Sequence, residues 1–124
     1  MEFLDRHALA SAWVALQRAT DGSALQSDSQ WSAIQLNMMC IEDPEQAWGS
    51  VVEIFELSSD PWVLENLGAG PVETLLGLHG QFALNAIESY MSEKKAFLGV
   101  LTHVWRDALS PEVAQGLTSL TKRR

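Results

Sequence analysis

Three histidines and sixteen acidic residues are the side chains of this sequence that could serve acid–base chemistry or bind a metal. His103 and Asp107 lie four residues apart, a spacing that places two side chains on the same face of a helix. Two ligands do not make a zinc site, and no H-E-x-x-H motif or cysteine cluster accompanies them in the sequence. We therefore expect a His–Asp pair on a helix surface here, and no metal site.

A second histidine, His79, ends a short apolar segment beside Gly80 and follows Glu73 by six residues. Histidine in the last turn of a helix meets the negative end of the helix dipole and can bond the free carbonyl groups there. This structural role is favoured over an acid–base or ligand role. A metal-dependent enzyme centred on His79 and His103 is the weakest functional alternative, and His7 has no partner nearby in the sequence.

The carboxylates are spread along amphipathic segments and are not grouped as an acid and a base. Asp43 and Asp60 each precede a proline, the pattern of an N-cap followed by the first helical residue. Glu53 and Glu56 are three apart and are most simply a solvated face. The sequence has no Gly-rich phosphate loop, no G-x-S-x-G motif and no recognised Cys–His pair. It therefore predicts neither an enzyme nor a cofactor.

The length of 124 residues and the apolar fraction of 47% predict one folded domain over residues 1–124. Cys40 is the only cysteine and lies in an apolar run, so we expect a buried thiol and no intrachain disulfide. The N-terminus lacks the pattern of a signal peptide, and no apolar run approaches the roughly 20 residues that span a bilayer. We expect a cytoplasmic protein.

Charge is distributed unevenly along the chain. The net charge of −8 argues against binding to nucleic acid or anionic membranes through a basic surface. After Arg18 the next basic residue is Lys94, and the segment between them, the acidic block, holds twelve acids. These acids are Asp21, Asp28, Glu42, Asp43, Glu45, Glu53, Glu56, Asp60, Glu65, Glu73, Glu88 and Glu93. Two explanations fit the block equally well: the acids are helix caps and chance occurrences, or they form a negative surface that recognises a partner.

Apolar residues recur at helical spacing along most of the chain, and nothing alternates with period two over a useful length. We expect helices over residues 4–18, 28–41, 44–57, 61–68, 71–79, 81–91, 93–109 and 111–121, with a loop over 20–30 and a basic tail over 122–124. Trp31, Ile34, Met38 and Ile41 lie on one face of the second helix, and residues 36, 39 and 40 broaden it, so we expect this helix to be apolar on two sides and to pack inward between neighbours. Pro71 is placed to start the fifth helix and Gly80 to end it.

The sequence therefore predicts an all-α fold of seven or eight short helices joined by short turns. Two architectures fit this pattern. The recurring Pro punctuation suggests a HEAT-like α-solenoid, whereas the degenerate spacing of the segments suits an irregular helical bundle.

Four short motifs carry a resemblance to a known family. They are Pro44-Glu45-Gln46-Ala47-Trp48, then Gly70-Pro71-Val72-Glu73-Thr74-Leu75-Leu76, then His79-Gly80, and finally Val104-Trp105. Together they resemble an uncharacterised family of small bacterial all-helical domains, in which a PExAW segment precedes a GPLExLL…HG segment. Val72 stands where leucine is commoner. The resemblance implies an all-helical fold and supplies no activity.

The leading hypothesis is a small protein-binding domain, in particular an immunity protein that neutralises a basic toxin by covering its active site. Exposed tryptophans would supply apolar anchors within the acidic surface. The residues expected to contact the partner are Glu42, Asp43, Glu45, Trp48, Glu53, Glu56, Asp60, Trp62 and Glu65. The alternative is a scaffold or adaptor that holds a peptide or helix in an apolar groove near Trp48, Trp62 or Trp105. No direct nucleic-acid or membrane contact is expected.

Overall fold

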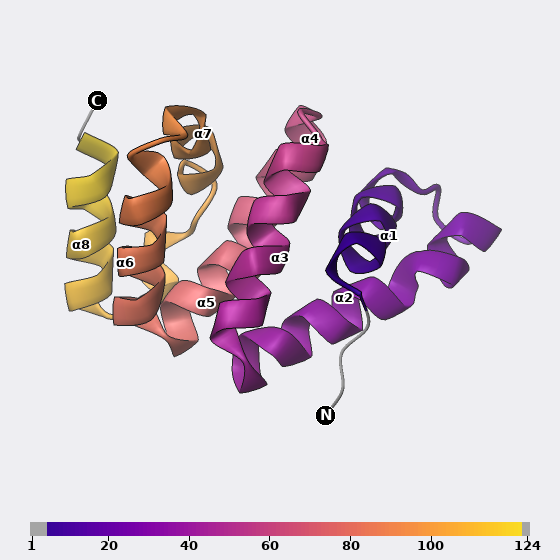
Figure 1. Ribbon diagram of the computed structural model, residues 1–124, viewed down its shortest axis with the longest axis horizontal. Helices are drawn as coiled ribbons and strands as arrows, with labels where there is room; N and C mark the ends of the chain where they lie inside the picture. Colours follow the sequence, from indigo (N-terminus) through magenta and orange to yellow (C-terminus); the bar gives the residue numbers. More distant parts are fainter. Residues whose placement is uncertain (1–4, 123–124) are drawn as a thin grey trace.

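The chain is mainly helical over the residues that its computed structural model describes, 5–122 (Figure 1). No β-strand occurs in that range, so the predicted all-α fold class is confirmed. In chain order the α-helices are α1 (Arg6–Arg18), α2 (Ala24–Glu42), α3 (Pro44–Leu57), α4 (Pro61–Leu67), α5 (Glu73–Leu78), α6 (Gly80–Met91), α7 (Leu98–Leu101) and α8 (Pro111–Lys122). A π-helical turn (Gly68–Val72) and the 3-10 segments Lys95–Phe97 and Arg106–Ala108 lie between them.

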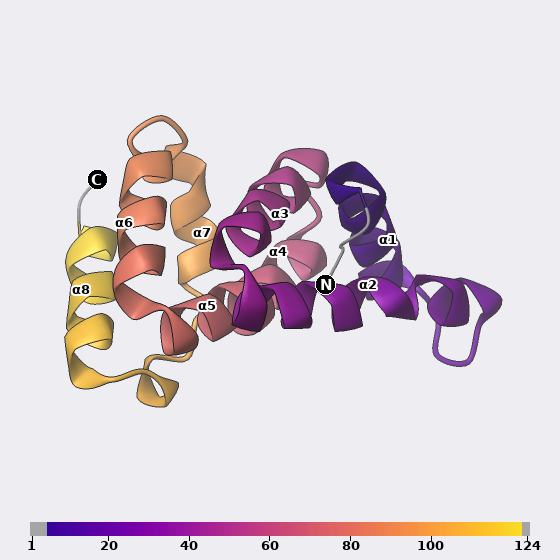
Figure 2. The same ribbon diagram turned by 60° about the horizontal axis from the view of Figure 1, so that its bottom comes forward.

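The helices follow one another along the long axis of the molecule, from α1 and α2 at one end to α6 and α8 at the other (Figure 1). α1 packs on α2, α3 and α4, while α6 packs on α8. Figure 2 shows α2 and α5 succeeding each other along one side, and they are in contact. This order is that of a short solenoid, but helix lengths range from 4 to 19 residues, so the units are unequal.

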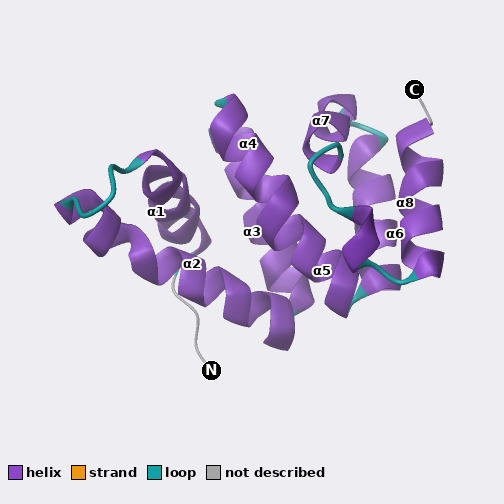
Figure 3. Cartoon of the chain, turned by 180° about the vertical axis from the view of Figure 1, so that it is seen from behind, coloured by secondary structure: helices purple, strands orange, loops and turns teal. Residues whose placement is uncertain are grey.

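Short loops join the helices (Figure 3), and several helices begin where the sequence predicts. The Asp43 carboxylate accepts the Gln46 N–H at 3.3 Å, and the Asp60 carboxylate accepts the Trp62 N–H at 2.9 Å. Each of these N-caps satisfies a backbone donor that has no partner within its helix. Both predicted caps are confirmed. None of the helices between residues 5 and 122 is long and apolar enough to cross a membrane.

The loop predicted over residues 20–30 is wrong, because α2 begins at Ala24. The Ser23 hydroxyl accepts the Gln26 N–H at 3.1 Å, and the Gln26 side-chain oxygen accepts the Gly22 N–H at 2.7 Å. This is close to a capping box of the S-x-x-Q type, which the polar composition of the segment conceals. The turn itself is confined to the residues around Gly22, whose φ of 79° is one that glycine adopts without strain.

The face of α2 that was expected to point inward is also wrong. Leu36, Met39 and Cys40 are buried in the core, whereas Ile34 is 63% exposed and Ile41 is 56% exposed. α2 is apolar on more than one side, so its periodicity alone does not select the side that packs. The consequence is an apolar strip on the outside of the longest helix.

α4 and α5 are continuous through the π turn, so Pro71 does not start a helix as predicted. Proline lacks an N–H and its ring clashes with the carbonyl four residues earlier in an α-helix. The turn widens instead, and the N–H of Glu73 bonds the carbonyl of Gly68, five residues back. α5 ends at Leu78, because His79 leaves the helical conformation with φ −135° and ψ 56°, and Gly80 begins α6 instead of ending α5.

The prediction of a single helix over residues 93–109 is also wrong. The segment divides into the 3-10 turns and α7, and the chain is extended at Trp105. The Trp105 backbone N–H is accepted by Glu73 of α5 at 2.7 Å, a contact between segments distant in sequence. Trp105 is 67% exposed and does not face inward as expected. Of the predicted basic tail, Lys122 closes α8, and Arg123 and Arg124 lie outside the described residues.

Candidate protein-binding surface

The outward side of α3 carries three of the predicted partner-binding acids. Glu45, Glu53 and Glu56 are separated by intervals of eight and three residues, which places them on neighbouring rows of one helix. Glu45 and Glu56 are exposed, and Glu53 is half-buried. Glu53 and Glu56 line an open cleft of about 470 Å³ between α3 and the start of α1. These three acids therefore lie on one side of α3, and their role in binding a partner stays a prediction.

Two basic residues of α1 enter this α3 cleft, which the sequence did not predict. His7 Nδ1 lies 2.9 Å from a carboxylate oxygen of Glu53. The guanidinium of Arg6 occupies the space that a Cβ on Gly49 would fill, so glycine permits this close approach to α3. Because Arg6 and His7 precede the acidic block, they supply positive charge that the block itself lacks.

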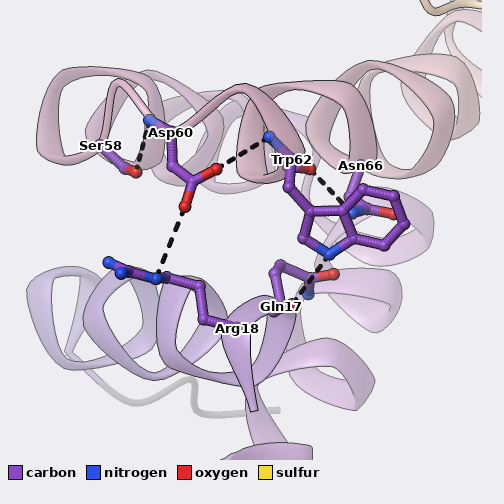
Figure 4. Close-up of polar contacts among 6 residues, drawn as sticks. All are labelled: Gln17, Arg18, Ser58, Asp60, Trp62 and Asn66. Carbon is purple, nitrogen blue, oxygen red and sulfur yellow. Dashed lines mark hydrogen bonds and ion pairs between the residues drawn. The ribbon is translucent and has the colours of Figure 1, made fainter. Parts of the chain in front are cut away.

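Asp60 and Trp62 lie at the other end of α1, where α4 begins (Figure 4). Besides capping α4, Asp60 pairs with Arg18, whose Nε is 3.5 Å from its carboxylate. Trp62 is 55% exposed, and its ring N–H donates to the carbonyl of Gln17 at 2.9 Å. The Trp62 ring is thus fixed at one edge while its apolar face meets solvent, as an interface anchor requires.

Trp48 is not an exposed anchor, contrary to the prediction. Its ring is half-buried and meets Phe97 and Tyr90 edge-on, with centroids 5.6 and 6.1 Å away. This aromatic cluster joins α3 to α6 and to the 3-10 turn that precedes α7. Tyr90 O–H donates to the Glu56 carboxylate at 2.8 Å. Burial, with that hydrogen bond and the nearby negative charge, raises the pKa of Tyr90 far above its usual range.

The nine predicted residues therefore form separate groups. The α3 acids lie near the first turn of α1, and Asp60 with Trp62 lies near its last turn. His7 and Arg18, which mark these ends, are eleven residues apart, or about 16 Å along a helix. Glu65 is exposed on α4, and exposed Glu42 lies at the corner where Asp43 caps α3. One interface of ordinary size spans this distance.

A pocket of about 290 Å³ lies beside the π turn, and no motif or spacing in the sequence indicates it. Trp13 of α1, Leu36, Asn37 and Cys40 of α2, and Pro71 of the π turn are among its lining residues. Burial raises the pKa of the Cys40 thiol to about 11, so the thiol is neutral near pH 7. Lining residues from several helices converge only after folding, which no sequence spacing records.

His79 has a structural role different in detail from the one predicted. Its Nε2 donates to the carbonyl of Cys40 at 2.8 Å, so it fastens the end of α5 to α2 instead of bonding its own helix. His103 and Asp107 do not share a helix face, because α7 ends at Leu101, and Asp107 accepts from the Trp105 ring at 3.2 Å. Within residues 5–122, no three His, Cys, Asp or Glu side chains are grouped as metal ligands.

The fold and this surface define an all-α domain of consecutive short helices. The chain belongs to DUF6869, a family of unknown function, whose family model matches residues 18–124. No curated protein and no solved structure matches the chain. The match agrees with the uncharacterised helical family that the sequence resembles. It carries over no activity.

Proposed function

We propose that this protein is a protein-binding domain that docks a basic partner through the side formed by α3 and α4. One observation carries the proposal: this side is strongly acidic after its internal pairs are formed. Seven acids lie on it or at its edge, and the basic side chains that reach it are Arg6, His7 and Arg18 of α1. The seven acids are Glu42, Asp43, Glu45, Glu53, Glu56, Asp60 and Glu65.

The specific form we favour is an immunity-type inhibitor that covers the cationic active site of a toxin. Excess charge of one sign accelerates association with an oppositely charged partner and makes the binding depend on salt. Trp62 adds an exposed aromatic surface beside the acids. An adaptor that holds an apolar peptide is the second candidate, supported by the exposure of Trp105 and Ile34. It predicts binding that is insensitive to salt.

The contacts of each acid show which of them can be changed to lysine without disturbing the fold. Glu53 and Asp60 pair with α1, and Asp60 also caps α4, so reversing them would weaken the fold as well as the surface. Glu45, Glu56 and Glu65 are exposed, which suits a triple change to lysine. Because Glu56 also accepts the Tyr90 hydroxyl, thermal unfolding of the triple variant is compared with that of the wild type before binding is scored. Asp28, Glu93 and Glu112 are exposed on other parts of the chain. Changing them to lysine gives a control with the same change in net charge.

The experiment is capture of the partner from the native host with the tagged protein, followed by binding of the purified partner at roughly 0.05 and 0.5 M salt. The proposal expects a basic partner, tighter binding at low salt and at least about tenfold weaker binding of the triple variant. The control variant should bind as the wild type does. If both variants lost the same binding affinity, net charge alone would explain the effect. If neither lost affinity, the proposal that the acidic surface binds the partner would be refuted.

A further inference from the structure

The pocket beside the π turn lies where α2 meets the π turn and α5, and residues of α1 and α4 complete its lining. Ala33, Asn37 and Cys40 follow one row of α2, and Pro71 and Thr74 line the pocket from the π turn and α5. Past the pocket, His79 Nε2 donates to the Cys40 carbonyl and joins the end of α5 to the last turn of α2. Leu78 and Ile41, the chain neighbours of these two residues, are 53% and 56% exposed. We call the surface from the pocket to Ile41 and Leu78 the α2–α5 groove, and residues 33 to 41 of α2 span about 12 Å along it.

The pocket is large enough to hold one side chain. Its volume of about 290 Å³ is close to the lower end of the range of roughly 300–1,000 Å³ typical of sites for drug-sized ligands. Trp13, Leu36 and Cys40, none more than 4% exposed, form its apolar floor, and the polar side chains of Gln17, Asn37, Asn66 and Thr74 also line it. The lining contains no charged residue, which favours an apolar group.

The negative charge at the end of the groove favours an occupant with a basic residue beside its apolar side chain. Glu42 is exposed beside Ile41 in the last turn of α2, where no basic residue offsets the negative end of the helix dipole. Glu45 is exposed in the first turn of α3. The whole acidic block, which supplies both α2 and α5, contains no lysine or arginine. A lysine or arginine on the occupant would therefore meet uncompensated negative charge here.

The walls of the groove are helices, so no strand edge is present along it to pair with an extended peptide. Binding must rely on side chains that enter between the helices, as when an amphipathic helix lies in a groove. We propose that the α2–α5 groove receives an amphipathic helix of the partner, with one apolar side chain in the pocket and a basic residue beside Glu42. This rests on the proposed function and names the segment of the partner that is recognised.

α2 offers matched variants for the test. Ile41→Gln removes an apolar contact of the groove, whereas Leu25→Gln makes the same kind of change on an exposed residue at the far end of the same helix. Glu42→Lys reverses a charge at the groove, and Asp28→Lys reverses an exposed charge distant from it. All four changes lie on exposed positions, so loss of the fold does not confuse the result.

The probe is a synthetic helical peptide of leucine and lysine with leucines at helical spacing, and its control replaces every lysine by glutamate. Binding is measured by fluorescence anisotropy and mapped by amide chemical shifts. We expect the shifts to gather at Asn37, Ile41 and Leu78. Ile41→Gln and Glu42→Lys should each weaken binding about tenfold, and the matched variants less than about twofold.

Three results would overturn the proposal that the α2–α5 groove binds an amphipathic helix. They are failure of the basic peptide to bind, equal binding of the acidic peptide, or shifts confined to the α3 cleft. A concentration-dependent dimer that Ile41→Gln abolishes would place a second copy of the chain in the groove instead. Each of these leaves the proposed function separately testable, because the triple reversal of Glu45, Glu56 and Glu65 is scored with the natural partner.

Discussion

The close packing of the π turn against α7 makes a sharp prediction for glycine-to-alanine changes. A Cβ at Gly68 would overlap the backbone carbonyl oxygen of Val100 and would touch the Cβ of His103. A backbone atom cannot turn aside as the end of a flexible side chain can. Gly77 of α5 is exposed, and a Cβ there would meet nothing within 4 Å. The same chemical change should therefore have opposite effects at the two positions.

The magnitudes follow from two competing terms. Overpacking costs about 1–3 kcal/mol, and alanine in place of glycine in a helix returns up to about 1 kcal/mol. For Gly68→Ala we expect a net loss of about 1–2 kcal/mol in the free energy of unfolding, since the clash is with backbone. For Gly77→Ala the clash is absent, and we expect a gain of about 0.5–1 kcal/mol. The two variants should differ by about 2 kcal/mol.

Urea unfolding followed by tryptophan fluorescence and by circular dichroism measures this difference. With a slope of about 1–3 kcal/mol per molar urea, the midpoints of the two variants should be about 1 M apart. The slope should stay constant, which shows that both variants expose the same surface on unfolding. If Gly68→Ala proved as stable as Gly77→Ala, the close approach of the π turn to α7 would be refuted.

Three further predictions concern single side chains. Because the folded-state pKa of Tyr90 is raised, its contribution to stability is complete below about pH 10 and is lost as the pH rises. Tyr90 is the only tyrosine, so tyrosinate absorbance should stay absent in native protein beyond pH 10 but appear near it in urea; coincident titrations would contradict this. The buried Cys40 thiol, with its pKa of about 11, should react with a thiol reagent at least about 100-fold more slowly in native than in unfolded protein, and comparable rates would show it to be accessible. Asp60→Ala should cost about 0.5–2 kcal/mol through loss of the α4 cap, whereas Arg18→Gln should cost less than about 1 kcal/mol because its ion pair is largely exposed; thermal unfolding compares them, and equal losses would assign the effect to the pair.

The sequence predicted helix starts best where the chemistry of one or two residues favours a cap. Asp43 and Asp60 before proline begin α3 and α4 because a carboxylate there accepts a backbone N–H and proline needs none. Ser23 and Gln26 held the same kind of information for α2, and the prediction missed it among polar neighbours. Pro71 was misread because a proline that follows glycine signals either a helix start or a distorted turn. Packing against α7 accompanies the second outcome.

The candidate site was predictable only in part. The acids of α3 share a side of that helix because their spacing follows the helical repeat, and this is local information. The positions of Arg6, His7 and Arg18 beside them required α1 to pack across both helices. The exposure of Trp62 and the burial of Trp48 likewise depend on neighbours far along the chain.

The sequence by itself determined an all-α chain, its main helix caps and an acidic block without lysine or arginine, because these depend on composition and on contacts within a few residues. Only the packing of the helices sets which side of α2 is buried, how the helical segment after Met91 is divided, and that a pocket forms beside Pro71. The physical reason is that burial of an apolar side chain is favourable against any surface that excludes water. Which surface that is depends on how the helices pack.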